Sequence, residues 1–333
     1  MSSLPAPGAG VVPDDPGPAR SRPAGLAVRR SRVALDVGGF ALVTAGTGIV
    51  LAVLGAALGL GSRTVGDGTI VATPAQGLWL IVPVAAALGW YQLGTGRERR
   101  LGRDSDLVSR FGLSWRIRDP DWSLGVAIGL PVGLLAVELI AGSESGVQRV
   151  ALAGTGHAAV AAILPAIAVA AAVEATIGEF IFRGYGTAAL AGLGPAGGPS
   201  ARLRSDLLIG VAWWLWSLPL IGVWLSEAAY RGMTSVPRVV FVPLYLVALL
   251  AMSVVLGELR RRSGSIWPGV ALRTIGGTAA GLLLTGRHLT FAGHFDVLYS
   301  PAATSVIAVA GFALAGYLIR RRGSVDRTPA ETS

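Results

Sequence analysis

The chain contains no cysteine and no lysine, and charged residues of either sign make up only 14% of it. Without cysteine, disulfides and thiolate chemistry are excluded, and cysteine usage says nothing about the redox compartment. The net charge of +9 is therefore carried by arginine. These arginines stand in short clusters between apolar runs, which is typical of membrane topology rather than of a nucleic-acid-binding surface. We expect no nucleic-acid partner.

Apolar residues dominate the composition. They make up 52% of the 333 residues, and the mean hydropathy is +0.61, far above that of an ordinary soluble domain. A membrane-spanning helix needs about 20 apolar residues. Eight segments meet or approach this length: 36–61, 75–94, 122–142, 157–182, 206–226, 237–257, 265–286 and 302–319. The predicted fold class is therefore an all-α, polytopic integral membrane protein with about eight transmembrane helices.

The arginines predict the orientation of these helices. If the N-terminus is cytoplasmic, 22 of the 28 arginines fall in inside segments and five in outside segments. Because cytoplasmic segments carry the excess of positive charge, we expect both termini to be cytoplasmic. Residues 1–32, rich in Pro, Gly, Ala and Arg, are predicted to be a disordered basic tail. Residues 33–319 would form the membrane domain, and 320–333 a second cytoplasmic tail.

The bias towards Arg, Ala and Gly is typical of a GC-rich genome. We therefore expect a multi-pass protein of a bacterial plasma membrane, whose first partner is the lipid bilayer.

Charged side chains inside apolar segments are the first candidates for a site. Glu174 and Glu179 lie in the fourth segment and Arg273 in the seventh. An isolated charge at the bilayer centre costs about 2.5–3.5 kcal/mol on insertion scales, so such residues usually have partners. Glu174 and Arg273 lie at similar depth when helices rise about 1.5 Å per residue. We predict a Glu174–Arg273 ion pair and a Glu179–Arg183 pair along one helix; alternatively, Arg273 extends to the interface.

Two further groups of residues are candidates for a cavity wall and for a metal site. Trp213, Trp214 and Trp216 surround Ser217 and form either an aromatic cavity wall or ordinary packing at a proline kink. His288, His294 and Asp296 offer metal ligands, but their spacing fits no standard zinc pattern. We therefore predict neither a metal nor another cofactor.

Three stretches resemble motifs of one family. Residues 179–184, EFIFRG, are similar to the second half of the EExxxR(G) motif of the CPBP family of CAAX-processing and bacteriocin-processing intramembrane proteases. Residues 212–219, AWWLWSLP, resemble its second motif, in which an aromatic residue precedes a histidine. Residues 262–273 resemble its third, a GSIWP-like start of a helix carrying HxxxN, and Phe111-Gly112-Leu113 is also similar. The resemblance covers about 100–290 and implies the fold of these proteases.

The same positions depart from the family in their chemistry. The resemblance implies a first glutamate acting as base on a water, with histidines and an asparagine positioning that water or the oxyanion. Here Gly178 stands at the first glutamate position, Ser217 and Arg273 at the histidine positions, and Gly277 at the asparagine position. Glycine supplies no base, and serine does not replace imidazole in proton transfer near neutral pH. Arginine stays protonated and does not bind a metal.

These departures favour a CPBP-like protein with a degenerate catalytic site that binds or scaffolds a membrane-embedded or lipidated peptide or protein. Two alternatives stay open: an active glutamic-type intramembrane endopeptidase, and a small transporter with an intramembrane Glu/Arg pathway. The candidate catalytic residues are Glu179, Glu174 and Arg183. The candidate cavity and ion-pair residues are Ser217, Trp213, Trp216 and Arg273.

Overall fold

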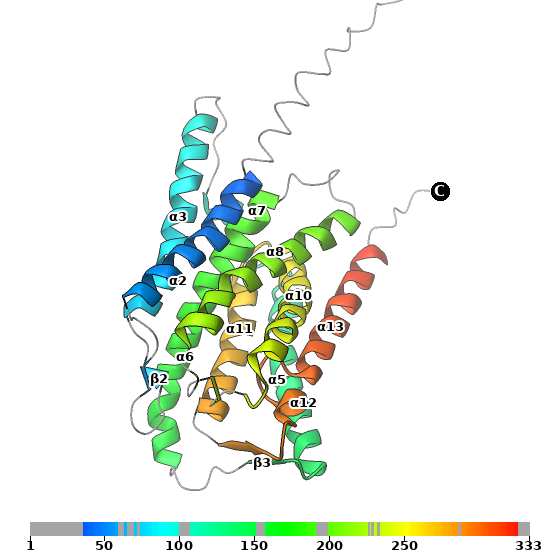
Figure 1. Cartoon of the computed structure of the whole chain (residues 1–333). Coiled ribbons are helices and arrows are strands. Elements are labelled where there is room, and N and C mark those ends of the chain that lie inside the picture. The colour runs from blue at the N-terminus through cyan, green and yellow to red at the C-terminus, as the bar shows by residue number, and fades with distance from the viewer. Residues whose placement is uncertain are drawn as a thin grey trace, which may run out of the picture.

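A computed structural model of the chain describes residues 36–58, 63–64, 70–71, 74–99, 107–150, 157–190, 199–225, 227, 230–231, 234–285 and 288–325. These residues form a bundle of long helices (Figure 1). The predicted tail 1–32 lies outside the described residues, as does most of 320–333. The last helix continues past the predicted boundary at 319, to Val325.

Helices occupy all eight predicted segments. Their bounds are η1 Leu42–Gly46, α2 Thr47–Ala57, α3 Pro74–Arg99, α4 Leu107–Phe111, α5 Pro120–Glu144, α6 His157–Glu179, η2 Phe180–Gly186, α7 Thr187–Leu190, α8 Pro199–Pro219, η3 Leu220–Trp224, α10 Arg238–Ser263, α11 Trp267–Ala280, η4 Gly281–Thr285, α12 Asp296–Tyr299 and α13 Val306–Val325. The segments labelled η are π-helices.

The fold class is confirmed: the chain is an all-α, polytopic membrane protein. Five helical stretches in the described residues are long and apolar enough to cross a bilayer: Asp36–Ala57, Pro120–Glu144, Ala161–Leu190, Ser200–Trp224 and Arg238–Ser263. Large apolar side chains such as Leu54, Ile140 and Val239 point outward and are exposed, as expected for a surface solvated by lipid tails. The count of eight spans and the side of the termini stay predictions.

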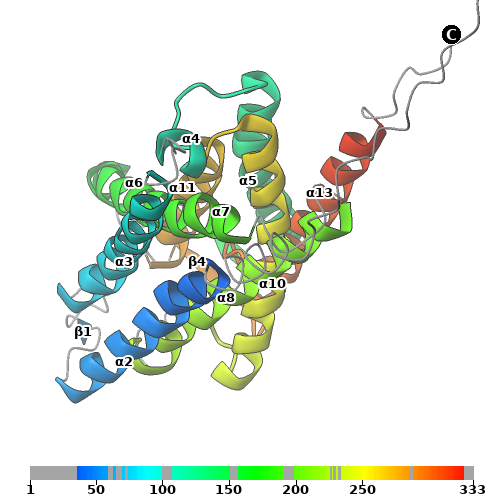
Figure 2. The ribbon, with the colours of Figure 1, turned by 90° about the horizontal axis from the view of Figure 1, so that it is seen from above.

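Two helices, α10 and α11, make the most contacts with their neighbours in the bundle. Helix α11 packs against both α6 and α5, while α10 packs against both α8 and α13. Figure 2 shows α2 and α3 side by side at one edge of the bundle. The buried core is aromatic here: Phe182 stacks on Trp213 with ring centres 5.1 Å apart, and Trp79 stacks on Trp216 at 3.9 Å. This core fixes η2 against α8.

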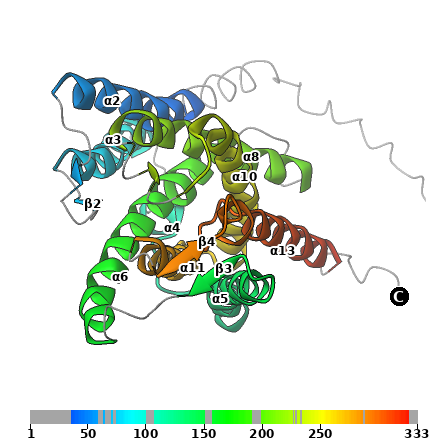
Figure 3. The same cartoon turned by 60° about the horizontal axis from the view of Figure 1, so that its bottom comes forward.

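Short strands connect helix ends. β1 (Arg63–Thr64) pairs antiparallel with β2 (Ile70–Val71), and β3 (Gln148–Val150) with β4 (Leu289–Phe291). In the second ribbon Arg149 lies opposite Thr290. Figure 3 shows this ribbon beside α11 and α5. Because β3 follows α5 and β4 follows η4, the ribbon joins the ends of these two neighbouring helices.

The other end of α11 is fixed by hydrogen bonds to the segment after α4. The Arg118 N–H donates to the Ser263 carbonyl at 2.8 Å, and the Ile266 N–H donates to the Gly112 carbonyl at 2.9 Å. Trp267 Nε1 donates to the Leu113 carbonyl at 3.2 Å. Gly112 has a φ of +67°, a conformation that suits glycine. The FGL and GSIWP-like stretches thus bind one another and set the height of α11 in the bundle.

A buried ionic network joins α8, α10 and α13 near the arginine-rich end. Arg261 donates to both oxygens of Asp206, at 3.0 and 2.6 Å, and to Glu258 at 3.0 Å. Arg320 donates to Glu258 at 3.1 Å. A Cβ at Gly257 would overlap the Asp206 carboxylate, so the glycine provides room for it. Because Asp206 is only 1% exposed, its charge depends on these arginines.

We expect Asp206→Ala to lower the free energy of unfolding by about 3 kcal/mol, because it leaves buried arginine charge without its bidentate partner. Unfolding in detergent micelles by chemical denaturant measures the change. Glu227→Ala is the matched control, since Glu227 pairs with Arg231 at 2.8 Å on an exposed surface and such pairs contribute about 1 kcal/mol or less. Equal effects of the two substitutions would show that the Asp206 network does not stabilise the bundle.

Candidate functional site

The EFIFRG stretch lies inside a helix rather than at its end. The fourth apolar segment was predicted to end at residue 182, but the structure continues the helix through η2 and then α7 to Leu190. Arg183 is consequently fully buried. A π-helical segment inserts extra residues into an α-helix and re-aims the side chains around it, often at functional sites. Glu179 is the last residue before this segment, so the helix geometry changes at the motif itself.

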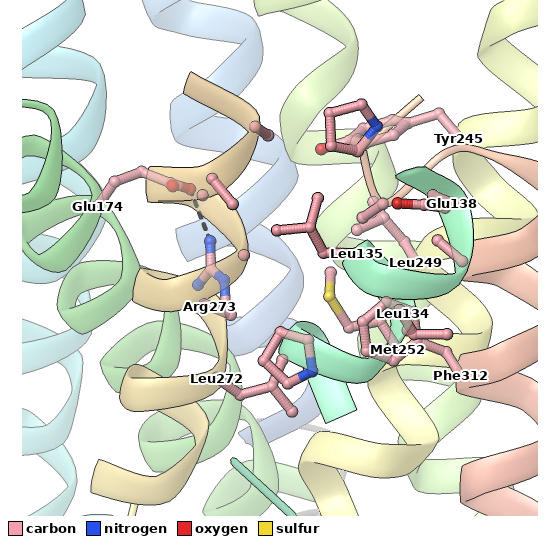
Figure 4. Close-up of a pocket in the computed structure, with 18 of the residues that line it drawn as sticks. Leu134, Leu135, Glu138, Glu174, Tyr245, Leu249, Met252, Leu272, Arg273 and Phe312 are labelled. Atoms are coloured by element: carbon pink, nitrogen blue, oxygen red, sulfur yellow. Dashed lines mark hydrogen bonds and ion pairs between the residues drawn. The ribbon is translucent and has the colours of Figure 1, made fainter. Parts of the chain in front are cut away.

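Arg273 of α11 is the centre of the charged cluster. Its Nη2 lies 2.6 Å from Glu174 Oε1, and its Nη1 lies 3.7 Å from Glu179 Oε1. The guanidinium carbon also lies 4.3 Å from the ring centre of Trp213, in a cation–π contact. The predicted Glu174–Arg273 ion pair between the fourth and seventh helices is confirmed, and Figure 4 shows it on one wall of a cavity.

The predicted Glu179–Arg183 pair is wrong. Arg183 Nη2 instead donates to Ser253 Oγ of α10 at 2.9 Å, and no ion pair joins Glu179 to Arg183 within the described ranges. The two side chains leave the helix towards different neighbours. Glu179 faces α11, where a Cβ at Gly269 would lie 2.5 Å from its Oε2. Glu179 is 1% exposed, and Arg273 of α11 lies 3.7 Å from its Oε1, while the Arg183 charge acts on it from a greater distance.

Gly178 lies directly against the Arg273 guanidinium. A Cβ built on Gly178 would overlap Arg273 Nη1, so the guanidinium fills the space that any side chain at position 178 would need. At Gly277, by contrast, a Cβ would meet Ala171 at an ordinary 3.4 Å. Two departures from the family motifs are therefore in contact: a side chain at 178 would make the Arg273 guanidinium move from its present position.

The aromatic residues of α8 divide into two roles. Trp213 lines the cavity and carries the cation–π contact with Arg273. Trp216 is 2% exposed, stacks on Trp79 and does not line this cavity, so for Trp216 the packing interpretation holds. Ser217 does not line it either: its hydroxyl donates to the Trp213 carbonyl at 2.9 Å and accepts from the Tyr245 hydroxyl at 3.4 Å. Ser217 is thus occupied within the helix packing.

The cavity has a volume of about 200 Å³ and lies between α5, α6, α8, α10, α11 and α13. Most of its lining is apolar, with leucine, methionine, phenylalanine and small residues from these helices. The charged lining residues are Glu174, Arg273 and Glu138. Figure 4 shows Glu138 across the cavity from the Glu174–Arg273 pair.

Sequence reasoning missed Glu138. It lies on α5, is 2% exposed, and accepts a hydrogen bond from Ser305 Oγ. The signal was present, because Glu138 is a single carboxylate within the apolar run 122–142, and ionisable residues inside membrane segments are functional candidates by default. Unlike Glu174, which has Arg273 at similar depth, Glu138 has no arginine at a matching depth in the sequence to mark it as one of a pair.

The histidine-containing segment forms a structural contact. Asp296 accepts hydrogen bonds from Thr234 Oγ1 at 2.8 Å and from the Ser235 N–H at 2.7 Å. Ser235 Oγ lies 2.9 Å from His294 Nδ1. His288 is buried. No group of three metal-ligating side chains occurs among the residues described. Asp296 thus ties the segment before α10 to α12.

The Gly178–Arg273 contact predicts a coupled response. We expect Gly178→Ala to lower the free energy of unfolding by about 1–3 kcal/mol, because the new methyl group displaces the guanidinium and overpacks the site. The effect should largely disappear in an Arg273→Ala background. Gly276→Ala is the control, since the nearest atom to its Cβ would be 3.9 Å away. Additive effects of Gly178→Ala and Arg273→Ala in a double-mutant cycle would contradict the contact.

We expect substitution of Arg273 to lower the free energy of unfolding more than substitution of Glu174. Arg273→Met removes the cation nearest to the buried Glu179, and we expect a loss of about 3–5 kcal/mol in unfolding free energy. Glu174→Gln should lose about 1 kcal/mol, because the Glu174 side chain is 51% exposed and the amide oxygen still accepts from Arg273. Denaturant unfolding of both variants checks this order. A larger loss for Glu174→Gln would mean that Glu174, not Glu179, depends on the arginine.

Comparison with known proteins agrees with the motifs. Residues 160–279 match the family model of type II CAAX prenyl endopeptidases, Rce1-like. The match spans α6 to α11 and thus includes all three motif stretches and the Gly178–Arg273 contact. No curated protein and no solved structure matches the chain. Residues 160–279 are therefore similar to the CPBP family of CAAX-protease-like membrane proteins, which the motif stretches also resemble.

Proposed function

We propose that this CPBP-like membrane protein binds a lipidated or membrane-embedded peptide without hydrolysing it. The observation that carries the proposal is the position of the Arg273 guanidinium, which lies against Gly178 and contacts Glu174 at 2.6 Å. A fixed cation stands where the resemblance implies a catalytic carboxylate. The site therefore lacks the group that would activate water.

The two surviving carboxylates are poor replacements for that base. A general base needs to contact the water whose proton it takes. Glu174 Oε1 is already occupied by Arg273, and Glu179 is 1% exposed and does not line the cavity. Arg183, the third candidate catalytic residue, is bound to Ser253. Of the three, Glu174 is the one that lines the cavity, and its Oε1 is held in the ion pair with Arg273.

Peptide binding is supported by two features of the chain, the helices that carry the motif stretches and the apolar cavity beside them. The matched family is described as prenyl endopeptidases, and α6, α8 and α11 carry its motif stretches in order. An apolar cavity adjoins the charged cluster, as a site for an apolar group beside a peptide would require. Loss of the base with retention of the surrounding helices favours binding over catalysis.

The test uses the purified full chain in proteoliposomes with a fluorescent prenylated peptide. We expect saturable binding and no cleavage, with Glu179→Gln and Glu174→Gln unchanged in the cleavage assay. Cleavage by the unmodified chain that Glu179→Gln abolishes would overturn the proposal in favour of a peptidase. Solute flux into the same liposomes, lost in Arg273→Ala, would favour a transporter instead.

A gain-of-function variant shows whether the assay can detect cleavage in this framework. The four departures are reversed together as Gly178→Glu, Ser217→His, Arg273→His and Gly277→Asn. Removing Arg273 at the same time as adding Glu at 178 avoids the overlap between the two positions. We expect cleavage in this variant and none when position 178 carries Gln. Cleavage by the Gln variant would show that the restored glutamate is not the base.

A further inference from the structure

Glu138 is a buried carboxylate that the family motifs do not account for. It lies on α5, outside the matched residues 160–279, and is 2% exposed. Its Oε1 accepts from Ser305 Oγ, and its Oε2 has no hydrogen bond from any described residue. No arginine or histidine of the described ranges forms an ion pair with it. A charge held this way in an apolar environment is unfavourable unless a partner arrives.

The opposite wall of the cavity cannot supply that partner. Arg273 is the cation that lines the cavity, and it is already engaged with Glu174 and near Glu179. The cavity lining therefore holds two carboxylates for one guanidinium. Between the two walls the lining is apolar, and Figure 4 shows Leu135 and Leu249 in the space separating Glu138 from the ion pair.

We propose that this cavity binds a small monovalent amine with an apolar body, with its ammonium group on Glu138 and its body against Leu134, Leu249 and Phe312. The ammonium would donate to the unoccupied Oε2 and compensate the excess negative charge. A cavity of about 150 Å³ holds one benzene ring, whereas drug-sized ligands need about 300 Å³ or more. At about 200 Å³ the site has room for a single-ring amine.

An anionic ligand fits the same lining poorly. It would need to displace Glu174 from Arg273 and would face the Glu138 carboxylate across an apolar space. A neutral apolar ligand would leave Glu138 Oε2 without a partner. The proposal does not rest on the peptide-binding function, because Glu138 lies outside the motif positions and its contacts are independent of Gly178.

Three probes of one shape separate these possibilities: 2-phenylethylamine, 2-phenylethanol and 3-phenylpropionate. The full chain is placed in nanodiscs of uncharged phospholipid, and binding is followed by calorimetry and by tryptophan fluorescence, since Trp213 lines the cavity. We expect the amine to bind at least tenfold more tightly than the alcohol, and the carboxylate not to bind. Glu138→Gln should reduce amine affinity at least tenfold and leave the alcohol unchanged.

Equal binding of amine and alcohol, or amine binding that survives Glu138→Gln, would overturn the proposal. So would binding of 3-phenylpropionate that depends on Arg273. Should Glu138→Gln not fold, Gly276→Leu provides the second test, because a Cβ there has free space and the larger side chain would fill the cavity while leaving Glu138 intact. Unchanged amine binding by Gly276→Leu would equally exclude the site.

Discussion

One guanidinium organises the centre of this protein. Arg273 approaches α6 from α11, binds Glu174, faces Glu179 and lies over the ring of Trp213. A charge in the low-dielectric interior of a membrane protein needs partners on several sides. The helices around it are arranged to provide them, and Gly178 gives the guanidinium its space. The packing of α11 against α6 therefore includes the contact of Arg273 with Gly178, the position at which the resemblance implies a glutamate.

The buried charged residues of the bundle include those paired with an opposite charge and Glu138, which forms no ion pair within the described residues. Asp206, Glu258, Arg261 and Arg320 satisfy one another and hold α8, α10 and α13 together. Glu138 is as buried as these acids but has only a serine hydroxyl. Each charge of such a buried pair depends on the other, because removing one partner leaves the other charge uncompensated. A buried charge without such a counterpart is instead suited to meet a ligand, and Glu138 alone of these acids lies on the cavity wall.

The helix framework agrees with the family, whereas the residues at the motif positions differ from it. The helices α6 to α11 match the CPBP family, and the FGL and GSIWP-like stretches are joined by hydrogen bonds that fix the start of α11. Those contacts are made by backbone groups and by the Trp267 side chain, away from the charged cluster around Arg273. In this chain the Arg273 guanidinium occupies the space next to Gly178 that a side chain at that position would need.

The sequence by itself determined the membrane fold, the helical segments, the family motifs and the Glu174–Arg273 pair, because hydropathy, motif spacing and helix rise are properties of the chain alone. Only the tertiary structure decided the partners of Glu179 and Arg183, the contact of Arg273 with Gly178, and the place of Glu138. Each of these depends on which neighbouring helix a side chain faces. Glu179 and Arg183 stand four residues apart, yet one meets α11 and the other α10. Sequence spacing gives the distance along a helix, whereas the packing of its neighbours decides which charge meets which.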